Sequence, residues 1–135
     1  MITTYAANKN LDLFLGATSL SVPGTWYLGL STTTIGNDGT GATEPSGAYA
    51  YARVSITNNK TNWGTASSNS LSNLVAFSFA ESTGSWGTIT YIFLADALSG
   101  GNIWLFESLS TPKVVATATT VTFAIGSLVC SQTNS

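Results

Sequence analysis

The sequence predicts a mainly β protein: an antiparallel β-sandwich or jelly-roll-like domain of about eight strands with one short N-terminal helix. Short apolar and aromatic runs recur along the chain, separated by turns rich in Gly, Pro and Asn. Strands do not alternate with helices, which disfavours a parallel sheet. A length of 135 residues is typical of one domain. We expect an N-terminal helical arm over residues 1–20 and a single β-sandwich domain over 21–135.

Residues 6–18 are expected to form the helix, because only here do apolar residues recur at helical spacing. The four positions are i, i+4, i+7 and i+8: Ala7, Leu11, Phe14 and Leu15. Polar residues occupy the opposite face, and Gly16 marks the expected end. A short amphipathic helix of this kind packs on a sheet or on a neighbouring subunit.

The rest of the chain is expected to form short strands joined by turns. The eight predicted strands cover residues 26–31, 50–57, 74–80, 88–95, 103–108, 114–119, 120–125 and 128–133. A Gly-rich loop over 32–47 follows the first strand, and loops of that length are often functional or interfacial. Residues 96–102 are a predicted hairpin turn, since Gly100 and Gly101 can supply positive φ angles.

Composition excludes several classes of function. Charged residues make up 7% of the chain, against about 25% in an ordinary domain, and histidine is absent. The four Lys and Arg residues are scattered, so no basic patch exists for nucleic acid. Cys130 has no His partner and is expected to be a small apolar residue in the last strand. We expect no metal or other cofactor, no membrane partner, and a soluble protein made in a cytoplasm.

No enzyme is predicted. The string STPK at 110–113 has the Ser-x-x-Lys spacing of some acyltransferases, but Pro112 interrupts it and β-type sequence flanks it, so a turn is expected. Nothing in the sequence brings together two of the carboxylates that a glycosidase would need: Glu44, Glu81, Asp96 and Glu107.

Arg53 lies inside the expected strand 50–57, where a buried guanidinium is costly unless it is paired. Glu44 is close in sequence and follows a flexible Gly-rich stretch. We predict a salt bridge between Glu44 and Arg53 that pins the loop 32–47 to the sheet. Asp96 is a second candidate partner, and an Arg53 that points to solvent is the alternative.

The aromatic residues have two interpretations. Trp26 and Trp104 can fill the core of the sandwich, with Trp63 and Trp86 closing its ends. Alternatively, exposed aromatic residues bordered by polar ones can stack on sugars or anchor protein interfaces. The candidates for interface or glycan contact are Trp63, Trp86, Tyr49, Asn37 and Asp38.

Seven strings, taken in order, resemble a known family. They are WYLGLSTT at 26–33, TEPSG at 43–47, YARV at 51–54, FAE at 79–81, WGTIT at 86–90, SGGN at 99–102 and LSTPK at 109–113. The family consists of small tailed-bacteriophage virion proteins, commonly labelled tail-fibre-like or capsid-decoration proteins. The resemblance covers nearly the whole chain and implies no catalytic residue.

The resemblance implies a structural role in the virion, assembled in the cytoplasm of the host bacterium. The first hypothesis is a capsid cement or decoration protein, a homotrimer that bridges capsomers by contact with the major capsid protein. The alternative is a tail-fibre or tail-associated module that binds a host-surface glycan. The scarce charge and the Ser- and Thr-rich surface suit packing against other protein in both cases.

Overall fold

The computed structural model describes residues 1–132 and shows a mainly β protein with antiparallel sheets, which confirms the predicted fold class. The helix and eight strands of this part of the chain are α1 (Thr4–Gly16), β1 (Thr25–Ser31), β2 (Val54–Thr57), β3 (Ser70–Ser72), β4 (Phe77–Ser78), β5 (Gly87–Ala95), β6 (Ile103–Val115), β7 (Thr122–Phe123) and β8 (Val129–Ser131). A short 3-10 helix spans Gly47–Tyr49. Residue 133, the end of the last predicted strand, lies outside the described residues.

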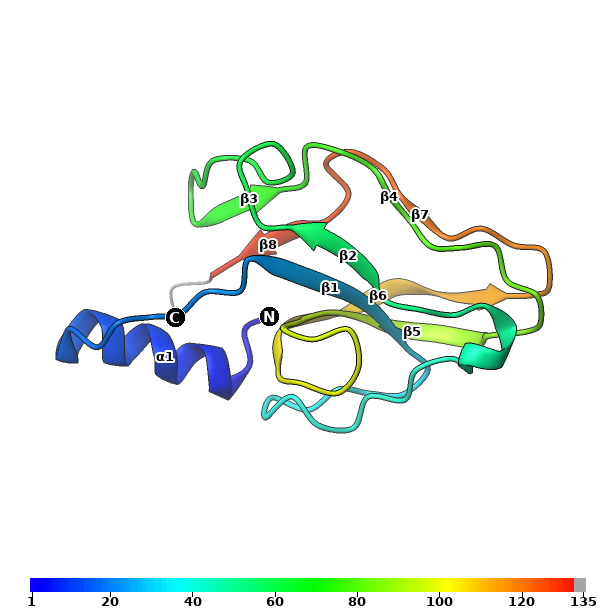
Figure 1. The fold of residues 1–135 in the computed structure, drawn as a ribbon, viewed down its shortest axis with the longest axis horizontal. Coiled ribbons are helices and arrows are strands. Elements are labelled where there is room, and N and C mark those ends of the chain that lie inside the picture. The colour runs from blue at the N-terminus through cyan, green and yellow to red at the C-terminus, as the bar shows by residue number, and fades with distance from the viewer. Residues whose placement is uncertain (133–135) are drawn as a thin grey trace.

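The body is a layered, sandwich-like arrangement (Figure 1). A four-stranded sheet has the order β2-β1-β5-β6, and two smaller sheets pair β3 with β8 and β4 with β7. The main core lies between the large sheet and the small ones: Leu28, Leu30 and Leu94 from the large sheet meet Phe77 and Leu128. Alternate residues of each strand point to opposite faces, so each of the central strands carries a second apolar set.

That second set faces the loop 32–47. Phe93, Ala95 and Phe106 pack there against Ile35, which the loop contributes and which is buried. The loop therefore covers one face of the large sheet while the small sheets cover the other.

The predicted turn at 110–113 is wrong, because β6 continues through that segment, although its register against β5 shifts between Ser108 and Lys113. β6 joins the expected strand 103–108 to the first two residues of the expected strand 114–119 and ends at Val115. Pro112 lacks a backbone N–H, which a central strand would not tolerate. β6 lies at the edge of the large sheet, and residues 109–112 have no partner in its register with β5, so Pro112 fits there.

Three further predictions of strands need correction. β2 begins at Val54 rather than at residue 50, so Arg53 precedes the strand. The expected strands 74–80 and 120–125 shorten to the two-residue strands β4 and β7. β3 was not predicted, because its sequence Ser-Leu-Ser is mostly polar and its pairing with β8 comes from distant sequence.

The predicted helix is confirmed as α1, and its N-cap explains where it begins. Thr3 is fully buried; its Oγ1 accepts a hydrogen bond from the Ala6 N–H and donates one to the Ile103 carbonyl. Tyr5 packs edge-on against Trp104 with 5.4 Å between ring centroids. The helix thus attaches to β6 through its first turns.

Asn73 joins the two small sheets. Its side chain is fully buried; Nδ2 donates to the carbonyls of Val75 (2.8 Å) and Ala124 (3.0 Å), and Oδ1 accepts from the Leu128 N–H (2.9 Å). These backbone groups have no strand partner in the ladders described, and the amide side chain of Asn73 bonds all three. The Ala124 carbonyl also accepts hydrogen bonds from the Ser127 N–H and hydroxyl.

The variant Asn73→Ala is expected to be strongly destabilised. A buried polar group left without a partner costs roughly 1–3 kcal/mol. The Val75 carbonyl and the Leu128 N–H lose the side-chain partner that Asn73 provides, whereas the Ala124 carbonyl keeps its hydrogen bonds from Ser127. Urea denaturation measures the free energy of unfolding. Asn58→Ala is the control, because Asn58 is exposed and its side chain makes one hydrogen bond, to the Pro23 carbonyl. Equal losses in the two variants would contradict the role given to Asn73.

Candidate functional site

The site begins at the end of β1, where the edge of the strand that faces β2 is no longer paired. β2 pairs with β1 only from Thr25 to Leu28, so the Leu30 N–H on the same edge has no strand partner. The segment that leads into β2 supplies one: the Tyr51 hydroxyl accepts a hydrogen bond from Leu30 at 3.0 Å. A buried N–H group needs such a partner, and this requirement brings Tyr51 and the adjacent Arg53 over the sheet.

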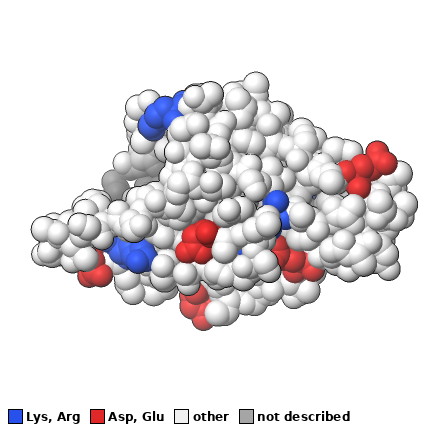
Figure 2. All heavy atoms as spheres, in the orientation of Figure 1, with Lys and Arg blue, Asp and Glu red and all other residues white. Residues whose placement is uncertain are grey.

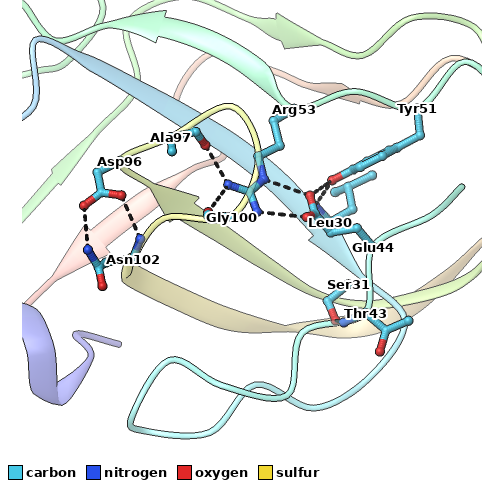
Figure 3. Close-up of polar contacts among 10 residues, drawn as sticks. All are labelled: Leu30, Ser31, Thr43, Glu44, Tyr51, Arg53, Asp96, Ala97, Gly100 and Asn102. Carbon is cyan, nitrogen blue, oxygen red and sulfur yellow. Dashed lines mark hydrogen bonds and ion pairs between the residues drawn. The ribbon is translucent and has the colours of Figure 1, made fainter. Parts of the chain in front are cut away.

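Arg53 and Glu44 form a bidentate ion pair (Figure 3). Arg53 Nε donates to Glu44 Oε1 at 2.9 Å and Nη2 donates to Oε2 at 2.8 Å, while the Tyr51 hydroxyl donates to Oε1 at 2.7 Å. The Arg53 side chain is 6% exposed and that of Glu44 is 28% exposed. This is the salt bridge predicted from the sequence. We call Glu44, Tyr51 and Arg53 the arginine hub.

The other edge of the guanidinium holds the β5–β6 turn. Nη1 donates to the carbonyls of Ala97 at 2.6 Å and Gly100 at 2.9 Å. The guanidinium carbon lies 5.0 Å from the centre of the Phe93 ring, within cation–π range. Arg53 therefore connects the loop 32–47, the start of β2 and the hairpin turn.

Gly29 makes room for this stack. It lies opposite Phe93 in the β1–β5 ladder, and a Cβ at this position would come within 2.2 Å of the ring. Any larger residue would displace the ring on which Arg53 rests.

The hub is held in one protonation state. Burial alone would raise the pKa of the Glu44 carboxyl, but hydrogen bonds from Arg53 and Tyr51 outweigh it and lower that pKa. Burial, together with the hydrogen bond to the Glu44 carboxylate, raises the pKa of the Tyr51 hydroxyl. Glu44 stays ionised and Tyr51 stays neutral at physiological pH, so the three groups fix geometry and do not exchange protons.

Further hydrogen bonds fasten the loop 32–47 along its length. The Thr43 N–H donates to Ser31 Oγ at 3.0 Å, and the Thr32 N–H donates to the Thr43 carbonyl at 2.9 Å. At the far end, the Asn37 carbonyl accepts from the Thr4 N–H at 2.8 Å. The loop therefore connects the hub to the beginning of α1.

Asn37 and Asp38, two of the candidate contact residues, are exposed at the tip of this loop. Asp38 Oδ1 accepts hydrogen bonds from the Thr40 hydroxyl and N–H, which lower the pKa of the carboxyl. The Asp38 side chain closes a local turn, and its hydrogen bonds hold the tip in shape.

The prediction of Asp96 as a partner of Arg53 is wrong. Its carboxylate accepts hydrogen bonds from the Asn102 N–H at 2.7 Å and from Trp104 Nε1 at 3.1 Å, and no Arg53 contact with it occurs in the described chain. Burial acts to raise the pKa of Asp96, but these hydrogen bonds lower it. The turn presents backbone carbonyls to Arg53 while Asp96 faces the other side (Figure 3).

Trp63 and Trp86 are core residues, as the first interpretation of the aromatics expects. They are 7% and 3% exposed, and Trp86 Nε1 donates to the Tyr49 carbonyl at 2.8 Å. Neither indole ring is exposed enough to stack on a sugar, so the alternative of sugar stacking is wrong for these two. Tyr49 remains exposed, with its ring against Gly84.

Cys130 lies in β8 and packs against the main core, and burial raises the pKa of its thiol.

Over residues 1–132, His, Cys, Asp and Glu form no cluster of three that could hold a metal ion. In the same part of the chain, the helical structure is neither long enough nor apolar enough to cross a bilayer.

Comparison with protein families gives the chain its class: it is a virion protein of tailed bacteriophages. The family model that matches is described as podophage GP4 fiber I protein gp80, and the match covers residues 1–131. The chain therefore belongs to this family. The resemblance expected from the seven sequence strings is confirmed. No curated protein matches the chain.

Glu44→Gln is expected to lower the free energy of unfolding by roughly 1.5–3 kcal/mol at pH 7, because the buried Arg53 loses its ionised partner. Urea denaturation measures the loss. The control is Glu81→Gln, since Glu81 is exposed, and its effect should stay within about 0.5 kcal/mol. A loss at Glu44 no larger than at Glu81 would contradict the hub.

The Glu44→Gln variant also has a pH signature. The pKa of Glu44 is lower in the folded protein than its ordinary 4.5, so its stabilising effect is complete above that value. The effect is lost as the pH falls through the folded-state pKa. Wild-type stability should therefore decline with acidification below pH 4.5 more steeply than that of Glu44→Gln. Equal declines in the two proteins would contradict this role of Glu44.

Proposed function

We propose that this virion protein is a structural subunit of a phage fibre. The observation that carries the proposal is the family match over residues 1–131, since the family description names a fiber protein. The match spans nearly the whole body of the protein, so it concerns the entire fold and not a shared segment. The role is mechanical: the subunit keeps its shape and packs against other protein, and no bond is made or broken.

The fold suits such a subunit. The large sheet is covered on both faces, and the arginine hub fastens the loop 32–47 and the β5–β6 turn to it. A fibre passes force between its ends through its subunits, so outer loops tied to a sheet resist deformation better than loops held only at their ends.

The surface also suits close packing of many copies. Figure 2 shows acidic and basic side chains as small, separate spots on an otherwise uncharged face. The chain carries ten charged residues and a net charge of −2, so identical copies repel one another weakly. Hydroxyl and amide groups remain to hydrogen-bond across contacts.

The capsid-cement hypothesis, with the major capsid protein as partner, is also a structural role in the virion but lacks a specific observation in its favour. Glycan binding has none either, because Trp63 and Trp86 are buried. Tyr49, Asn37 and Asp38 are exposed, but their side chains form no shared aromatic platform. The fibre role is therefore the one proposed, and it requires no catalytic group.

Immunogold electron microscopy of intact virions tests the location. Antibody raised against the purified protein should label fibres, and quantitative mass spectrometry should count a small whole-number multiple of the number of fibres. Labels spread over the head, with a copy number near that of the capsid lattice, would instead support a cement protein and overturn the fibre role. Virions treated with pre-immune serum are the control.

A further inference from the structure

The apolar stripe of α1 has no partner among residues 1–132, which the structure describes. Leu11, Phe14 and Leu15 are 55%, 71% and 86% exposed. Within the helix only Ala6 is buried, and it lies on the side opposite the stripe. α1 projects from the body of the sheets (Figure 1), and its last two turns present these side chains to solvent. We call Leu11, Phe14 and Leu15 the helix stripe.

An uncovered stripe of this kind is unusual for a helix of this length. Isolated helices of about 12–15 residues are marginal in water, and packing of the apolar face supplies most of their stability in proteins. α1 has 13 residues, and only its first turns touch the body. Exposed apolar patches mark sites of protein association.

The same chain carries an apolar groove at the open side of the sandwich, between β6 and β8. We call it the β6–β8 groove; its lining includes Trp63, Leu105, Leu109, Phe123, Val129 and Cys130. Its volume is about 310 Å³. An apolar cavity of about 150 Å³ takes up one benzene ring, so the groove has room for roughly two large side chains.

One residue that lines the groove, Trp63, carries an unsatisfied donor. Trp63 Nε1 is buried and has no hydrogen-bond partner among the residues that the structure describes. Buried polar groups in folded proteins nearly always have a partner.

We propose that the helix stripe of one copy docks in the β6–β8 groove of a second copy. Each molecule carries one helix stripe and one β6–β8 groove, so an assembly contains as many grooves as stripes. The capped and packed first turns of α1 hold it away from its own groove. The low net charge leaves little repulsion between copies.

Such a contact is head-to-tail, because it joins different surfaces of two identical molecules. Head-to-tail contacts close into a ring or continue as an open filament, depending on the rotation between neighbours. The homotrimer expected from the sequence is the ring of three. The inference rests on the proposed function only in assigning this contact to the fibre; the contact itself follows from the two surfaces.

Light scattering coupled to size-exclusion chromatography tests the contact on the purified full chain. At about 0.1 mM protein, a contact with a Kd of about 1 µM is saturated. The wild type should elute as an oligomer, whereas Leu15→Glu in the stripe and Val129→Glu in the groove should each be monomers. Leu13→Glu lies on the other side of α1 and Val114→Glu lies outside the groove; both controls should keep the wild-type mass.

Mixing the two defective variants gives the sharpest result. Leu15→Glu keeps an intact groove and Val129→Glu keeps an intact helix, so an equimolar mixture should form a complex of twice the 14.0 kDa chain mass and nothing larger. A monomeric wild type, a stripe or groove variant with the wild-type mass, or a mixture that stays monomeric would overturn the proposal. Oligomers in solution without fibre labelling on virions would instead overturn the fibre role alone.

Discussion

The ion pair between Arg53 and Glu44 is the contact on which the outer loops of this protein depend. One guanidinium makes four hydrogen bonds: two to the carboxylate from the loop 32–47 and two to carbonyls of the β5–β6 turn. A buried charge of this kind is tolerated because it is fully paired. Arginine is suited to the position, since its planar fork can bind a carboxylate on one edge and carbonyls on another. Gly29 and Phe93 provide the flat surface on which it lies.

The two sides of the molecule therefore differ in physical character. On the hub side, the loop and turn are tied to the large sheet, and their polar groups are paired. On the other side, between β6 and β8, an apolar groove stays open beside an unsatisfied indole N–H. The projecting helix adds an uncovered apolar stripe. One face with its loops tied down and one with uncovered apolar surface suit the packing that we propose for a fibre subunit, and membership of the fibre-protein family agrees with that proposal.

The sequence predicted the fold class, the helix and the Glu44–Arg53 pair for a common reason: each depends on local spacing or on the cost of one buried charge. The carbonyls of Ala97 and Gly100 could not be predicted, because backbone acceptors carry no residue-type signal. Asp96 was chosen as a partner by its charge alone, but the turn directs it to Asn102 and Trp104. The turn predicted at Pro112 failed because sequence does not reveal which strand lies at a sheet edge. Whether the helix stripe is covered depends on contacts between molecules, and the sequence of one chain does not specify those contacts.

Hydrogen–deuterium exchange of Arg53→Lys tests the central claim most directly. Lysine keeps the positive charge but cannot bind the carboxylate and the two carbonyls at once. The account predicts faster exchange at the amides of Leu30, Thr43 and Asn102, which the hub and its attached segments protect. The amides of the β3–β8 pair should exchange at wild-type rates. Unchanged exchange at the three amides, or an equal acceleration throughout the protein, would contradict the claim that Arg53 joins the loop and the turn.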